Sequence, residues 1–213
     1  MVVKETLQLY KSYLKVANSR WEYGNSVLYR MCEEEPEHKK VDVIVGKIWL
    51  IGRSYAAAIE RRKKVVDDDD DFYYDVVAPK LLEIGPELDD RIADLKESKN
   101  LIINDFKEIL KTHKFLMDTF YDLTGLEKRS LASKYLHFHC PEKFFIYDSR
   151  AKAGIGKLVK RPDKCLLTSV PDYDSEYGDF VCRMIELQKY LDDQFGIYEM
   201  PRKLDSFLLT GIK

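Results

Sequence analysis

The feature that most constrains this chain is residues 122–155, where a turn and a short apolar run alternate with segments of helical spacing. Gly125 lies in the turn, and residues 130–138 are expected to form a helix because their apolar side chains share one stripe. Pro141 ends that helix. The apolar residues 144–147 follow and lead directly to a carboxylate.

That carboxylate, Asp148, stands where a second helix is expected to begin, with Ser149 and Arg150 in its first turn. Apolar surroundings raise the cost of ionising a carboxyl group, whereas the N–H groups of a helix start stabilise the carboxylate. Such a position suits a catalytic acid or a simple helix cap, and both interpretations remain open. Asp148 is therefore the first side chain whose role must be explained.

The order of these features resembles the core of the helix-hairpin-helix DNA glycosylase superfamily. In that family a Leu-Pro-Gly-Val-Gly-x-Lys hairpin, a helix and a Pro-containing apolar run precede a catalytic Asp. Residues 123–128 match the hairpin, 130–139 the helix and 145–148 the stretch that carries the Asp. The hairpin is divergent, because Thr124 replaces the usual Pro and Glu127 replaces the second Gly.

The resemblance implies a mostly α fold, namely a two-lobed helical bundle with a helix-hairpin-helix motif and an active cleft between the lobes. We expect one compact all-helical unit over residues 1–213, with approximate lobes 1–100 and 101–213 and the motif core near 101–160. The implied activity is that of a DNA glycosylase acting on a damaged or modified base, in repair or antiviral defence. A bulky modified cytosine of phage DNA is one candidate substrate. The expected partner is duplex DNA with an extruded base, bound by a monomer without a cofactor.

In this activity Asp148 would stabilise the oxocarbenium character of the deoxyribose or activate the nucleophile. The family's attacking lysine falls near Lys128 or Arg129 without matching either, so Lys128 is the candidate amine and a monofunctional enzyme is favoured. Backbone N–H groups at a hairpin bind phosphate, and the expected DNA contacts are Gly125, Arg129, Ser130, Lys134 and Arg150. The expected base-pocket residues are Trp21, Tyr29, Arg53 and His137, with ordinary core or ion-pair roles as the alternatives.

The distribution of charge supports a local phosphate-binding face. The net charge is −2, but residues 121–164 carry ten Lys or Arg against five Asp or Glu, a local charge of +5. Residues 165–200 carry −6. A basic segment that coincides with the hairpin is what nucleic-acid binding requires, although any charge-rich surface can show such fluctuations.

Composition narrows the class of protein. A hydrophobic content of 45% in 213 residues can form a sizeable core, and no apolar run is long enough for a membrane span. The four widely spaced cysteines favour reduced thiols in a cytoplasmic protein and lack iron–sulfur spacing. The aspartates 67–71 and the His-rich residues 137–140 are poor metal sets because neighbouring side chains diverge, so no metal is expected.

Helical spacing predicts one long helix over 4–32, or two helices with a break near Gly24, and further helices at 41–62, 86–96, 101–120, 177–195 and 200–209. Two other functions compete with the enzyme. One is a non-catalytic helix-hairpin-helix DNA-binding or regulatory module, and the weaker one is a helical protein-interaction domain. A pocket that opens onto Asp148 would favour the enzyme, whereas an Asp148 that only caps its helix would favour the binding module.

Overall fold

The computed structural model describes residues 2–16, 21–63, 71–196 and 198–212. This part of the chain is mostly helical, which confirms the expectation of a mostly α protein, and its only β pairing is an isolated bridge between Val2 and Val159. The elements are α1 Thr6–Val16, α2 Glu22–Glu34, α3 Val41–Ser54, the π-helical turn η1 Phe72–Val77, α4 Ala78–Glu97, α5 Phe106–Thr124, α6 Arg129–His139, α7 Ser149–Leu158, the 3-10 turn η2 Cys165–Ser169, α8 Ser175–Phe195 and α9 Pro201–Thr210. None of these helices is both long and apolar enough to cross a bilayer.

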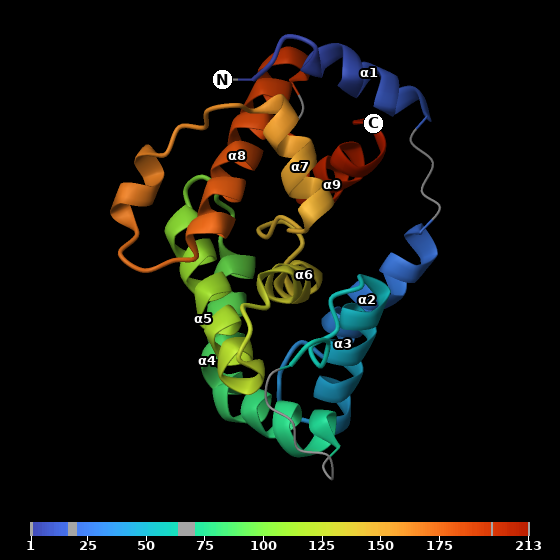
Figure 1. The fold of residues 1–213 in the computed structure, drawn as a ribbon, viewed down its shortest axis with the longest axis vertical. Helices are drawn as coiled ribbons and strands as arrows, with labels where there is room; N and C mark the ends of the chain where they lie inside the picture. The colour runs from blue at the N-terminus through green and yellow to red at the C-terminus, as the bar shows by residue number, and fades with distance from the viewer. Residues whose placement is uncertain (1, 17–20, 64–70, 197, 213) are drawn as a thin grey trace.

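Helix α6 lies in the middle of the fold, with α4 and α5 on one side and α2 and α3 on the other (Figure 1). It packs against α2, α3 and α5, whereas α7 packs against α8 and α9. Helix α1 packs against α9, where the rings of Tyr10 and Phe207 meet edge to face at 5.0 Å. A division at residue 100 therefore does not separate two groups of helices, because α1 belongs with the C-terminal ones.

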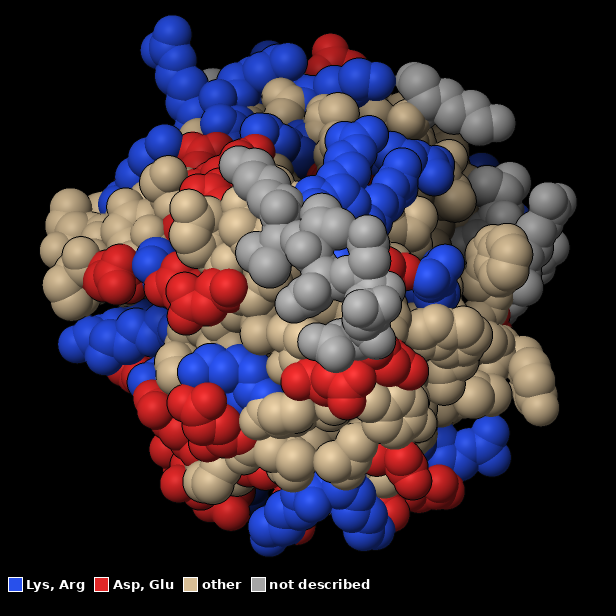
Figure 2. Space-filling model, turned by 60° about the horizontal axis from the view of Figure 1, so that its bottom comes forward, with Lys and Arg blue, Asp and Glu red and all other residues tan. Residues whose placement is uncertain are grey.

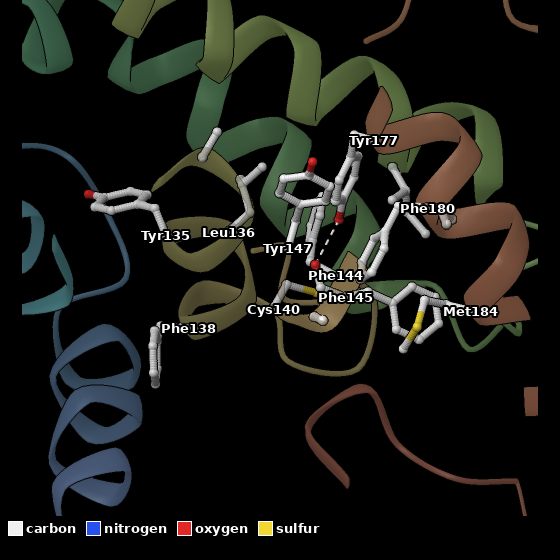
Figure 3. Packing of buried hydrophobic residues seen from close by; sticks show 14 of the residues in the cluster. Tyr135, Leu136, Phe138, Cys140, Phe144, Phe145, Tyr147, Tyr177, Phe180 and Met184 are labelled. Atoms are coloured by element: carbon white, nitrogen blue, oxygen red, sulfur yellow. Dashed lines mark hydrogen bonds between the residues drawn. The ribbon is translucent and has the colours of Figure 1, made fainter. Parts of the chain in front are cut away.

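The apolar run 144–147 crosses the core in an irregular conformation, packed against α8 (Figure 3). Its buried backbone groups are satisfied by side chains of its neighbours. The hydroxyl of Tyr177 donates to the carbonyl of Phe145 (3.1 Å), and the backbone N–H of Tyr147 donates to Oγ of Ser133 (3.0 Å). These bonds fix the direction of the chain as it reaches Asp148.

The turn at residues 125–128 joins α5 to α6. Gly125 ends α5 in the left-handed conformation (φ 66°), and its N–H donates to the carbonyl of Tyr121 at 2.7 Å. The hydroxyl of Thr124 donates to the carbonyl of Phe120 (2.7 Å) and accepts from the N–H of Leu126 (3.2 Å). Threonine thus holds the turn by hydrogen bonds at the position that matches the proline of the Leu-Pro-Gly-Val-Gly-x-Lys hairpin.

Several helix boundaries differ from the sequence prediction. The predicted break near Gly24 is wrong, because Gly24 lies inside α2 and the chain between α1 and α2 includes residues 17–20, which lie outside the described part. The pattern over 41–62 predicted a helix that in fact ends at Ser54. Helix α4 runs through Pro86 because its apolar stripe continues on both sides of the proline.

Replacing Gly125 by Ala is expected to destabilise the protein by about 1 kcal/mol, because a Cβ strains the left-handed conformation. The measurement is the midpoint of urea unfolding. Gly156→Ala is the matched control, since Gly156 lies within α7 and an added Cβ there meets no atom within 4 Å. This control is expected to be neutral or stabilising, and an equal loss in both variants would contradict the role given to Gly125.

Candidate functional site

Asp148 precedes helix α7, and its two carboxylate oxygens contact different groups. Oδ1 accepts hydrogen bonds from the backbone N–H groups of Arg150 (2.9 Å) and Ala151 (2.8 Å), which is the geometry of a helix N-cap. Oδ2 lies 3.9 Å from Nζ of Lys134, and the Asp148 side chain is 26% exposed. One oxygen therefore holds the start of α7, and the other faces a cation at a point that solvent can reach.

Lys134 reaches this point from the middle of α6, and its side chain is only 3% exposed. Nζ donates to Oγ of Ser130 (2.8 Å) and to the carbonyl of Tyr55 (3.3 Å). Burial lowers the pKa of Lys134, and the charges of Asp148 and Asp205 oppose that shift. Lys134 is thus placed inside the protein beside a carboxylate, not on the phosphate-binding surface predicted from the sequence.

A second carboxyl group, Asp205 of α9, lies near this pair. Its Oδ2 is 2.7 Å from Nη1 of Arg202, whereas its buried Oδ1 has no hydrogen-bond partner among the residues that the structure describes. Burial raises the pKa of Asp205 to about 7, and the charges of Arg202, Asp148, Lys134 and Arg150 also influence it. A buried lysine whose pKa is lowered and a buried aspartate whose pKa is raised, close to a second carboxylate, are typical of a functional site.

Two of the four expected base-pocket residues meet each other. The hydroxyl of Tyr29 and Nε2 of His137 are 2.7 Å apart, and Nδ1 of His137 is 2.7 Å from the carbonyl of Phe144. Burial lowers the pKa of His137 to about 4, so the neutral ring donates from Nδ1 and accepts the Tyr29 hydroxyl at Nε2. Trp21 is 78% exposed and Arg53 pairs with Glu60, so neither joins this pair as the sequence predicted.

The other residues predicted to act on or bind DNA have partners of their own. Nζ of Lys128 donates to the carbonyl of Arg61 (2.6 Å), so Lys128 is not the lysine beside Asp148. Arg129 pairs with Asp174, and its side chain is 15% exposed, which ties it to α8. Arg150 is exposed beside Asp148 and donates to the carbonyl of Leu209 (3.4 Å). Of the expected DNA contacts, Arg150 is therefore exposed, whereas Gly125 is half-buried and Ser130 is half-buried against Lys134.

Two hollows on the surface do not include the residues of this cluster. One of about 470 Å³ lies between α2 and α3 and includes Arg30, Glu34 and Asp42 in its lining. Another of about 370 Å³ lies between α7 and α8, where Lys152 and Arg183 line it. Asp148 lines neither hollow, so the expected cleft in front of this carboxylate does not coincide with either of them.

No three His, Cys, Asp or Glu side chains within the described ranges are arranged to hold a metal ion. Of the aspartates 67–71, weighed above as a metal set, residues 67–70 lie outside those ranges. The comparisons with models of known protein families, with curated proteins and with solved structures found no match. Arg202 and Asp205 were not predicted as site residues, because their i,i+3 spacing indicates an ion pair but not its burial.

Proposed function

We propose that this protein is a DNA glycosylase that releases a modified base at the pair formed by Asp148 and Lys134. The observation that carries the proposal is the buried amine of Lys134, 3.9 Å from Oδ2 of Asp148 at the start of a helix. The order of turn, helix and acid along the chain, and the charge of +5 on residues 121–164, add support for a DNA substrate.

The chemistry would use both side chains. As the bond between C1′ and the base nitrogen breaks, its electron pair leaves with the base and positive charge develops on the deoxyribose, which the Asp148 carboxylate would stabilise. Lys134, after passing a proton to the departing base, would attack C1′ as the neutral amine. The C1′–O4′ bond then opens as the C=N bond of a Schiff base forms, and this intermediate leads to strand cleavage. The lowered pKa of Lys134 supports this role because the neutral amine is the nucleophile. Lyase activity thus belongs to the proposal, with Lys134 in the role first given to Lys128.

One observation favours a second function, a DNA-binding module without chemistry. Oδ1 of Asp148 is fully engaged as a helix cap, and the hollows between α2 and α3 and between α7 and α8 do not include this residue. A cap alone would account for an aspartate at this position.

The test is a base-release assay on duplexes with modified bases, including phage DNA with modified cytosines. Wild-type protein is expected to produce abasic sites that alkali reveals, and borohydride is expected to trap a covalent protein–DNA complex. Lys134→Met is expected to lose the trapped complex, whereas Lys128→Met keeps it, because only Lys134 lies beside Asp148.

Circular dichroism of both variants establishes that they are folded. A complex that persists in Lys134→Met and disappears in Lys128→Met would assign the amine to Lys128. Protein that shifts DNA at low salt but yields no abasic site on any duplex would establish the binding module instead.

A further inference from the structure

Residues 55–63, which we call the basic turn, follow α3 in a conformation that the sequence did not predict. Ala56 (φ 51°) and Arg62 (φ 62°) adopt left-handed backbone angles, although neither is a glycine. Residues with a Cβ rarely adopt such angles because the Cβ clashes with the backbone. They keep these angles only where surrounding contacts impose them. The conformation of the basic turn is therefore held by the rest of the structure.

Contacts with neighbouring elements supply that constraint. The N–H of Ala57 donates to the carbonyl of Gly52 (2.7 Å), and a Cβ at Gly52 would lie 3.1 Å from Cα of Ala58. Glu60 is held from two sides, by the guanidinium of Arg53 and by the hydroxyl of Tyr73. The turn is thus packed closely against the end of α3 and against η1.

The basic turn also contacts the segment that carries the candidate site. Nζ of Lys128, in the turn between α5 and α6, donates to the carbonyl of Arg61 at 2.6 Å. Nζ of Lys134, beside Asp148, donates to the carbonyl of Tyr55 at 3.3 Å. Both ends of the basic turn are therefore fixed to the α6 segment, one at the turn 125–128 and the other at the buried amine.

This arrangement leaves a group of cations facing solvent. The side chains of Arg61 and Arg62 are exposed and form no ion pair with any residue in the described ranges. Nζ of Lys63 lies 4.1 Å from the centre of the Phe72 ring. Figure 2 shows Lys and Arg side chains gathered in the upper half of the face that it draws, with mixed charges below. Elsewhere arginines such as Arg129 and Arg183 are paired with carboxylates.

We propose that the basic turn forms a second phosphate-binding surface, which binds the DNA backbone together with the turn 125–128. The inference rests on the proposed DNA substrate and names the residues that would hold it, Arg61 and Arg62. Arginine suits this role because its planar guanidinium binds phosphate oxygens bidentately. The first N–H groups of α6, which no side chain caps, would bind an adjacent phosphate.

The experiment measures the affinity for a fluorescent duplex between about 50 and 200 mM salt, because each phosphate neutralised adds about 0.9 to the slope of log affinity against log salt. The Arg61→Ala/Arg62→Ala double variant is expected to lower that slope by about 2 and to weaken binding about tenfold or more. Lys39→Ala/Lys40→Ala removes the same charge from exposed lysines already paired with Glu37 and Glu35, and is the matched control.

The control is expected to keep the wild-type slope, and circular dichroism establishes the folding of both variants. Wild-type binding with an unchanged slope in the Arg61/Arg62 variant would overturn the second surface and leave the DNA substrate standing. Equal losses in both double variants would also overturn it, since the effect would then follow net charge alone. Absence of DNA binding by the wild-type protein would overturn this inference and the proposed function together.

Discussion

Asp148→Asn is expected to lower the rate of base release by at least about 100-fold, because the amide keeps the shape of the side chain but not its negative charge. The Oδ1 atom of asparagine can still accept from the N–H groups of Arg150 and Ala151, so α7 stays capped. The positive charge that develops on the sugar would then no longer be stabilised by a carboxylate. The measurement is abasic-site formation in single turnover with protein in excess.

Asp163→Asn is the matched control for this variant. Oδ1 of Asp163 also accepts a backbone N–H, that of Cys165 at 2.9 Å, but it lies in an exposed loop outside the candidate site. Its base release is expected to equal that of wild type. Asp148→Ala removes the cap as well as the charge, so it should also lose about 1 kcal/mol of stability. A near wild-type rate in Asp148→Asn would contradict the proposed chemistry and leave Asp148 a helix cap.

The free energy of unfolding is expected to fall by several kcal/mol as the pH is lowered from about 6.5 to 4. Burial lowers the pKa of His113 and His137 to about 4 and that of His139 well below its ordinary value. In this window the unfolded chain binds protons at these rings and the folded protein does not, so acid favours unfolding. Asp205 acts in the opposite direction, because its raised pKa lets the folded protein bind a proton there. The loss of stability from the three histidines is expected to exceed the gain from this one carboxyl group.

Chemical denaturation at several pH values measures this fall, and His139→Phe tests its origin. Both ring nitrogens of His139 are buried without a partner among the described residues, and the ring stacks on His38 at 5.2 Å. Removing one titrating ring should reduce the slope by about 1.4 kcal/mol per pH unit within the window. Lys39→Ala, on the surface, should leave the slope unchanged. An unaltered slope in His139→Phe would show that this histidine does not contribute.

The sequence predicted the local structure best from residue 106 onward. The helix expected over 130–138 is α6, and Asp148 caps the helix that was expected to follow it. These predictions succeed because an amphipathic stripe, a proline and a helix cap act within one or two turns of the chain. The pattern over 41–62 failed beyond Ser54, because contacts with Gly52, Tyr73 and α6 fix the basic turn there.

The residues of the candidate site could be predicted only in part from the sequence. Asp148 could be identified from its own neighbours in the sequence, whereas the resemblance pointed to Lys128 as the amine and Lys134 was expected to contact DNA. The structure separates them, since Lys134 is buried beside Asp148 and Lys128 binds the carbonyl of Arg61. Trp21 was chosen for its ring, but exposure depends on which helices cover it.

The sequence by itself therefore determined the helical class, the turn between α5 and α6, and the placing of a carboxylate at a helix start, all of which depend on short-range patterns. Only the tertiary structure decided that Lys134 faces Asp148, that Asp205 of α9 lies near this pair, and that the carbonyl of Tyr55, after α3, accepts from Lys134. The physical reason is that burial and charge proximity arise from helices packing across the chain. A side chain's pKa and partners follow from that packing, and no local pattern encodes them.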